Sequence, residues 1–322
     1  MTFAVVFPGQ GSQSVGMLAA LGQQHQEIRD SFAEASDVIG RDLWQLAQEG
    51  PADALSDTRV TQPLMFTAGV AVWRVLKAQG LSAPVAVAGH SLGEFSAMVA
   101  SESLTFSDAL KLVHKRATLM AEAVPEGEGG MAALLGMEDD AVVSLCESLT
   151  GERVTEAVNF NAPGQVAISG HLDALQNTVD EAKAQGCKRA MMLAVSVPNH
   201  SSLMKPAGAE LAEFMDSLSF TEGSVPLVQN ATAEVASNLQ TQIERLKEHV
   251  YKPVYWTRTV QNLRDRHGVS MLIEAGPGKV LTGLSKRIDR ALPTLPVDTP
   301  ESLAKVLEVT QSTVNENSEA GA

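Results

Sequence analysis

Residues 85–100 read Val-Ala-Val-Ala-Gly-His-Ser-Leu-Gly-Glu-Phe-Ser-Ala-Met-Val-Ala, and this stretch decides the fold prediction. The apolar run 85–88 is typical of a strand buried in a parallel sheet, whereas 95–100 has apolar residues at helical spacing. Between them, residues 89–93 fit the G-x-S-x-G nucleophile elbow. Such a turn lifts Ser91 out of the sheet at a helix N-terminus, where the helix dipole and the free N–H of Leu92 can receive an oxyanion. The alternative is a small Ser-Gly turn that only connects strand to helix.

Strands and helices alternate outward from this motif. We predict strands at 3–7, 225–229 and 271–274, and helices within 14–46, 67–79, 107–123, 240–250 and 257–266. Strands that alternate with helices indicate a parallel sheet covered by helices. The sequence therefore predicts an α/β fold.

A different pattern occupies residues 128–196, beyond the glycine-rich break at 127–130. Strands at 131–136, 154–160, 165–169 and 189–195, with helices at 139–149 and 172–185, give the order β-α-β-β-α-β. This is the ferredoxin-like split motif, which can bury a core of its own. We therefore expect 128–196 to be a domain inserted into a larger one formed by 1–127 and 197–310. Residues 311–322 are polar and acidic, and we expect a flexible tail.

Composition excludes several classes of protein. Apolar residues make up 44% of the 322 residues and charged residues 19%, which is typical of a globular chain. With 24 Lys and Arg against 38 Asp and Glu, the net charge is -14, so we expect no nucleic-acid partner. We also expect no signal peptide and no membrane span. Two cysteines suit a reducing cytosol, so the predicted location is cytoplasmic.

An elbow serine needs a base, and the chain has 7 histidines. His200 follows the inserted domain directly, and domain junctions are where pockets tend to form. It is the best candidate, and His249 is the second. Gly9 and Gly11 flank Gln10 after the first strand, which would free the Gln10 N–H to face an oxyanion. Arg116 lies mid-helix among apolar residues, where it either snorkels to solvent or aims its guanidinium at a substrate carboxylate.

Several motifs together resemble the malonyl-CoA:acyl carrier protein transacylases of bacterial type II fatty-acid synthesis. They lie in the family's order and spacing from residue 3 to about 309. They are Phe7-Pro8-Gly9-Gln10-Gly11-Ser12-Gln13, Thr61-Gln62-Pro63, 89–94, Val113 with Arg116, Asn161-Ala162-Pro163-Gly164-Gln165, 195–200 and 276–281. The resemblance implies an α/β-hydrolase-like large domain with an inserted ferredoxin-like small domain. It also implies transfer of malonyl from coenzyme A to the phosphopantetheine thiol of acyl carrier protein through a malonyl-serine.

The resemblance also implies roles for individual residues. These are Ser91 as nucleophile, His200 as base, the backbone N–H groups of Gln10 and Leu92 as oxyanion hole, Arg116 as partner of the malonyl carboxylate, Gln62 near the place where coenzyme A enters, and the backbone carbonyl of His249 as the acceptor that orients His200. The chain departs from the family at three positions, where Asn199, Ser201 and His249 stand in place of Ser, Cys and Gln.

The partners expected from the resemblance are malonyl-CoA and holo acyl carrier protein, with no metal and no cofactor, and we expect a monomer. Acyl carrier proteins are acidic, so docking on a chain of net charge -14 needs a local basic patch. We predict that Lys188, Arg189, Lys286 and Arg287 form it and flank the mouth of the pocket; unrelated solvated charges are the alternative. Two related functions stay open, namely the malonyl transferase of a malonate decarboxylase and a stand-alone polyketide-synthase acyltransferase. A serine thioester hydrolase and a non-catalytic carrier-binding scaffold are more distant rivals.

Overall fold

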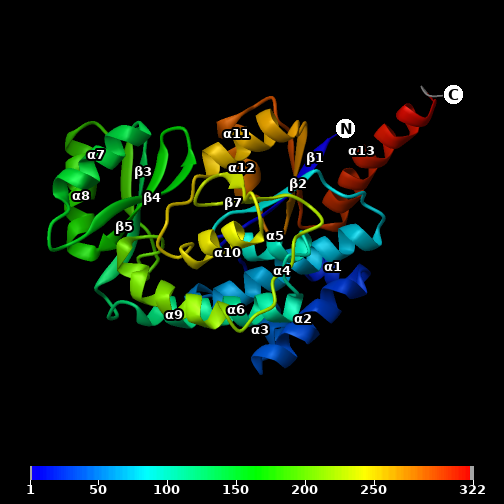
Figure 1. Ribbon diagram of the computed structural model, residues 1–322, viewed down its shortest axis with the longest axis horizontal. Helices are drawn as coiled ribbons and strands as arrows, with labels where there is room; N and C mark the ends of the chain where they lie inside the picture. Colours follow the sequence, from blue (N-terminus) through cyan, green and yellow to red (C-terminus); the bar gives the residue numbers. More distant parts are fainter. Residues whose placement is uncertain (1, 320–322) are drawn as a thin grey trace.

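Strand β1 (Phe3–Phe7) lies inside a six-stranded sheet in the computed structural model, which describes residues 2–319 (Figure 1). The strand order is β10-β9-β1-β2-β7-β8. Every neighbouring pair is parallel except β7 and β8, which run antiparallel. The other strands are β2 (Ala86–Gly89), β7 (Leu227–Gln229), β8 (Glu234–Val235), β9 (Met271–Ala275) and β10 (Thr294–Val297).

Both faces of this sheet are buried. Successive side chains of a strand point to opposite faces, and those of β1 divide between two hydrophobic cores. Phe3, Val5 and Phe7 belong to the core that α4 (Thr58–Ala78), α5 (Gly93–Ala100) and α6 (Phe106–Glu122) cover. Ala4 and Val6 belong to the core that α11 (Trp256–His267) and α12 (Val280–Ile288) cover. The predicted helix-covered parallel sheet is confirmed.

The remaining helices of the large domain surround these layers. The predicted helical stretch 14–46 is three helices, because the chain breaks at His25 and at Gly40, whose φ is 73°. Helix α4 begins at Thr58 rather than at 67, because the Asp57 carboxylate caps it by accepting the Arg59 N–H. The helices not yet given are α1 (Ala19–Gln24), α2 (Gln26–Ile39), α3 (Leu43–Glu49), α9 (Lys205–Met215), α10 (Leu239–Lys247) and α13 (Pro300–Glu319), with 3₁₀ turns η1 (Ala54–Ser56) and η2 (Ser202–Met204).

The inserted segment forms a separate antiparallel sheet with its own core, beside the large sheet (Figure 1). Its strand order is β4-β5-β3-β6, and two helices cover it. The chain order β-α-β-β-α-β is as predicted, so the fold class is confirmed. The elements are β3 (Gly129–Leu135), α7 (Asp139–Leu149), β4 (Thr155–Ala162), β5 (Gln165–His171), α8 (Leu172–Ala184) and β6 (Arg189–Met192).

Helix α13 extends into the C-terminal segment. Residues 311–319, expected to belong to a flexible tail, continue α13 up to Glu319. The physical reason is that no glycine or proline follows Pro300 before Gly321, so no helix breaker stops the chain earlier. Residues 320–322 lie outside the described part of the chain.

Within residues 2–319, no helix combines the length and the apolar character that crossing a membrane requires.

Candidate active site

Ser91 stands at the turn between β2 and α5, with a φ of 49°. A side chain is strained in this left-handed region, and such strain is characteristic of functional turns. The glycines on either side permit the turn. A Cβ on Gly89 would collide with the backbone of Gly93, and a Cβ on Gly93 would collide with the backbone of Phe7. The strand–turn–helix predicted for the elbow is therefore present, with the serine at its apex.

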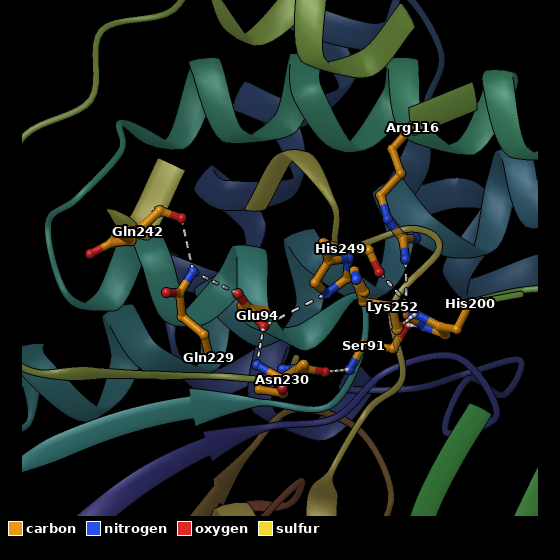
Figure 2. Close-up of polar contacts among 10 residues, drawn as sticks. Ser91, Glu94, Arg116, His200, Gln229, Asn230, Gln242, His249 and Lys252 are labelled. Carbon is orange, nitrogen blue, oxygen red and sulfur yellow. Dashed lines mark hydrogen bonds and ion pairs between the residues drawn. The ribbon is translucent and has the colours of Figure 1, made fainter. Parts of the chain in front are cut away.

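His200 lies against this serine. Its Nε2 is 2.7 Å from Ser91 Oγ, and its own φ of 65° is also left-handed (Figure 2). Its Nδ1 faces two backbone carbonyls, His249 O at 3.0 Å and Lys252 O at 3.1 Å. A carbonyl can only accept, so Nδ1 carries the proton and Nε2 is free to accept one. Burial, assisted by the positive charge of Arg116, lowers the pKa of His200 to about 3, so the imidazole is neutral at pH 7.

Two backbone N–H groups are free to receive an oxyanion. Within residues 2–319, no acceptor takes the N–H of Leu92, at the start of α5, or that of Gln10, after β1. The Ser91 N–H is not available, because it donates to Asn230 Oδ1 at 2.6 Å. The two free groups are those that the resemblance implied.

Arg116 is 1% exposed, so it does not snorkel to solvent. Its Nη2 lies 3.4 Å from Ser91 Oγ, and its Nη1 donates to Gln62 Oε1. Gln62 is itself buried and is held by Thr58 Oγ1 at 3.0 Å. Burial lowers the pKa of Arg116 to about 9, and no carboxylate of the described residues forms an ion pair with it. A buried, unpaired guanidinium beside a serine is chemically suited to an anionic substrate group.

The second histidine considered as base does not reach the serine hydroxyl. His249 is buried, and no hydrogen-bond partner for its ring nitrogens lies within the described chain. Its ring packs against Phe95, and its Nε2 is 3.7 Å from Glu94 Oε2. Burial holds the pKa of His249 well below its usual value. His90 also faces away from the nucleophile, with its Nε2 2.6 Å from Asn161 Oδ1.

The four predicted docking residues lie at one end of the small sheet. The Lys188 side chain packs on Gly136, whose N–H donates to Gly164 O at 2.7 Å. At the same β4–β5 turn, Gln165 accepts from Arg287 at 3.0 Å. Arg189 starts β6, and Lys286 and Arg290 belong with Arg287 to a basic hollow beside the turn.

Sequence reasoning did not identify the roles of Asn230, Glu94 and Lys252. Asn230 directly follows β7, and a polar residue after a buried strand was a usable signal, because binding groups gather at the carboxyl ends of parallel strands. The role of the Lys252 carbonyl could not be predicted from the sequence, because every residue type supplies a backbone carbonyl.

No set of three or more His, Cys, Asp or Glu side chains in residues 2–319 is arranged to hold a metal ion.

Comparison with known proteins agrees with this geometry. Residues 4–310 match the acyl transferase domain family. The chain is 46% identical over 307 residues to the malonyl CoA-acyl carrier protein transacylase of Escherichia coli K12, covering 95% of this chain and 99% of that one. It is 40% identical to the transacylase of Bacillus subtilis, covering 95% and 96% of the two chains.

Solved structures agree as well. The malonyl-CoA:acyl carrier protein transacylase of Xanthomonas oryzae superposes with a TM-score of 0.93 at 45% identity, over 96% of this chain and 99% of that one. A malonyl transacylase in complex with the acyl-carrier protein of a type II polyketide synthase also gives 0.93, at 44% identity and the same coverage. By its sequence, its fold and its serine elbow, the chain belongs to the acyl transferase domain family.

Proposed function

We propose that this enzyme transfers malonyl from coenzyme A to the phosphopantetheine thiol of an acyl carrier protein, through a malonyl ester on Ser91. The family membership and the relatives' activities support the reaction class. The contact of 2.7 Å between Ser91 Oγ and His200 Nε2 supports the covalent route.

In the first half-reaction, Ser91 Oγ attacks the thioester carbonyl while its proton moves to His200 Nε2. The C–O bond forms, and the carbonyl electrons move to an oxyanion that the N–H groups of Gln10 and Leu92 receive. The intermediate collapses, the C–S bond breaks, and the imidazolium returns its proton to the departing coenzyme A sulfur. The His249 and Lys252 carbonyls stabilise the imidazolium through Nδ1–H.

In the second half-reaction, the carrier thiol gives its proton to His200 and attacks the malonyl-serine. The C–S bond forms, the C–O bond breaks, and Ser91 Oγ regains the proton. Each half-reaction balances with serine and histidine, so the proposal needs no metal or cofactor. All of these groups come from one chain, which supports an enzyme active as a monomer. Its two cysteines are free thiols, which supports a cytoplasmic location.

The burial and position of Arg116 are the observation that supports malonyl as the acyl group. Its guanidinium is buried 3.4 Å from the nucleophile, with Gln62 holding one nitrogen. Burial of a charge is costly unless it is paired, and the distal carboxylate of a malonyl group would supply the missing pair. An acetyl group would leave the guanidinium unpaired.

The basic residues at the end of the small sheet support an acidic carrier as the second substrate. Lys188 and Arg189 lie at the end of the small sheet beside the β4–β5 turn, and Lys286 and Arg287 line a hollow next to the same turn, in a chain of net charge -14. A local patch of this kind can orient an acidic partner that the overall charge repels.

A polyketide carrier is the second candidate, because one structural neighbour is a malonyl transacylase in complex with such a carrier protein. Incubation with labelled malonyl-CoA, followed by mass spectrometry and then by addition of holo carriers of either type, tests the proposal. We expect the label on Ser91 and then on the carrier thiol. Absence of an acyl-serine would refute the mechanism, and rapid release of free malonate without a carrier would indicate a hydrolase.

A further inference from the structure

A buried polar network extends behind the nucleophile, from Gln242 through Gln229, Glu94 and Asn230 to Ser91 (Figure 2). Glu94, Gln229 and Asn230 are 1%, 1% and 2% exposed. The mechanism described above uses none of them. Burial of so many polar groups requires a compensating reason, because each one loses its contact with water.

Asn230 holds the backbone that leads from β2 into Ser91. Its Oδ1 accepts the Ser91 N–H at 2.6 Å, and its Nδ2 donates to Gly89 O at 2.6 Å. A left-handed serine persists only where its surroundings determine the backbone, and this carboxamide fixes the two consecutive peptides, 89–90 and 90–91, that lead into the strained residue. It also occupies the Ser91 N–H, which leaves the N–H of Leu92 as the elbow's own oxyanion donor.

Glu94 in turn holds Asn230. Its Oε2 accepts the Asn230 backbone N–H at 2.7 Å, and its Oε1 lies 3.5 Å from Gln229 Nε2. Gln229 Nε2 also donates to Gln242 O at 3.0 Å. The carboxyl thus joins the first turn of α5 to the end of β7, which are 136 residues apart in the chain. Without this acceptor, the buried Asn230 N–H would have no partner. The backbone of Asn230 would then no longer hold its side chain in place.

We propose that Glu94 and Asn230 are positioning residues for acyl transfer: Glu94 fixes the end of β7, and Asn230 thereby fixes the Ser91 peptide and the direction of its Oγ toward His200. Neither residue touches the acyl group. The role needs an acceptor oxygen at position 94 rather than a full negative charge. In agreement, burial raises the pKa of Glu94 to about 7, although Arg116 lies near enough to oppose the rise.

The inference rests on Ser91 being the nucleophile of the proposed function, so the experiment first establishes that point. Stopped-flow labelling with an alkyl fluorophosphonate reports serine reactivity without malonyl binding, and malonyl-CoA acylation is measured in single turnover. If the parent and Ser91→Ala label equally, the proposed function fails. If the parent labels on Ser91, the variants at 94 and 230 test the inference independently.

We expect Glu94→Ala and Asn230→Ala each to slow labelling and acylation by about 10- to 100-fold, since small misplacements of reacting groups cost on that order. The KM for malonyl-CoA should change less than about three-fold. Glu94→Gln should remain within about three-fold of the parent, because its carbonyl oxygen can accept the Asn230 N–H.

The double variant provides the decisive measurement. If Glu94 acts through Asn230, Glu94→Ala/Asn230→Ala is no slower than Asn230→Ala alone. Multiplied losses would show that Glu94 acts by another route and would overturn the inference, as would parent-like rates in Asn230→Ala.

Glu274 provides a matched control for loss of a buried carboxylate. It is 0% exposed and accepts the Leu281 N–H at 2.9 Å and the Thr282 N–H at 2.7 Å, at the start of α12. We expect Glu274→Ala to lower the melting temperature about as much as Glu94→Ala, while serine labelling per folded molecule stays within about three-fold. Equal slowing in both would show a general loss of stability and would overturn the positioning role.

Discussion

Replacement of Arg116 by alanine should change the acyl preference of the enzyme rather than its acyl transfer in general. Nη1 of the guanidinium is held by Gln62, whereas Nε has no partner among residues 2–319 and Nη2 makes a long contact of 3.4 Å with Ser91 Oγ. Nε and Nη2 share one edge of the guanidinium fork, the geometry that binds a carboxylate through two parallel bonds.

The structure sets the magnitude. A hydrogen bond to a charged group contributes about 1.5–3 kcal/mol, so two bonds at the lower value give about 3 kcal/mol, or roughly 150-fold. Arg116→Ala should therefore lower kcat/KM for malonyl-CoA by about two orders of magnitude. Acetyl-CoA offers no second carboxylate, so its kcat/KM should change by less than about five-fold.

The assay is acylation of the enzyme by each thioester in parallel, with the active fraction determined by fluorophosphonate labelling. Arg74→Ala is the control, because Arg74 is also a packed arginine but its side chain contacts Ser31, Glu34 and Phe106. Equal losses for malonyl and acetyl in Arg116→Ala would refute the carboxylate contact and make Arg116 a structural residue. A change of selectivity in Arg74→Ala would refute the assignment to one arginine.

Three further predictions concern the two histidines, the basic docking patch and the pKa of His200. His249→Gln should keep the rate of transfer within a few-fold of the parent, because the backbone carbonyl at this position orients His200. His200→Ala should lower the rate by about 10²–10⁴-fold. A hundred-fold lower rate in folded His249→Gln would show that the side chain takes part in catalysis. Replacement of Lys286 and Arg287 by Glu should raise the KM for the carrier and leave the KM for malonyl-CoA unchanged, with Lys77→Glu on α4 as control. An unchanged KM for the carrier would contradict the docking role of the patch. Burial is the main reason for the low pKa of His200, and the positive charge of Arg116 lowers that pKa further. Arg116→Ala should therefore raise the pKa of His200 and move the acid limb of acetyl-CoA acylation to higher pH; an unmoved limb would contradict the coupling.

The sequence predicted the architecture because both sheets leave local signals. Phe3–Phe7 is apolar throughout, as a strand with two buried faces requires, and the segment 128–196 carries its own alternation of strands and helices. The start of α4 was missed by nine residues, because Pro63 and the polar Thr61 and Gln62 conceal a helix whose buried polar side chains belong to the site. The sequence also could not decide the environment of Arg116, because a mid-helix position among apolar residues fits both an arginine that reaches solvent and a buried one.

What the sequence could not provide is the support of the strained residues. Pattern reasoning identifies Ser91 because the elbow is contained in five consecutive residues. The carboxamide that fixes its peptide is 139 residues away, and the carbonyls that orient His200 are 49 and 52 residues away. The Asn230 contact depends on the order β1-β2-β7, which places the end of β7 beside the elbow. A strained serine cannot hold its own conformation, so the fold must supply a side chain from a neighbouring strand end that hydrogen-bonds to the backbone of the turn. A polar residue at the end of the strand beside any such elbow is therefore the first candidate for this supporting role, even where the sequence around it carries no motif.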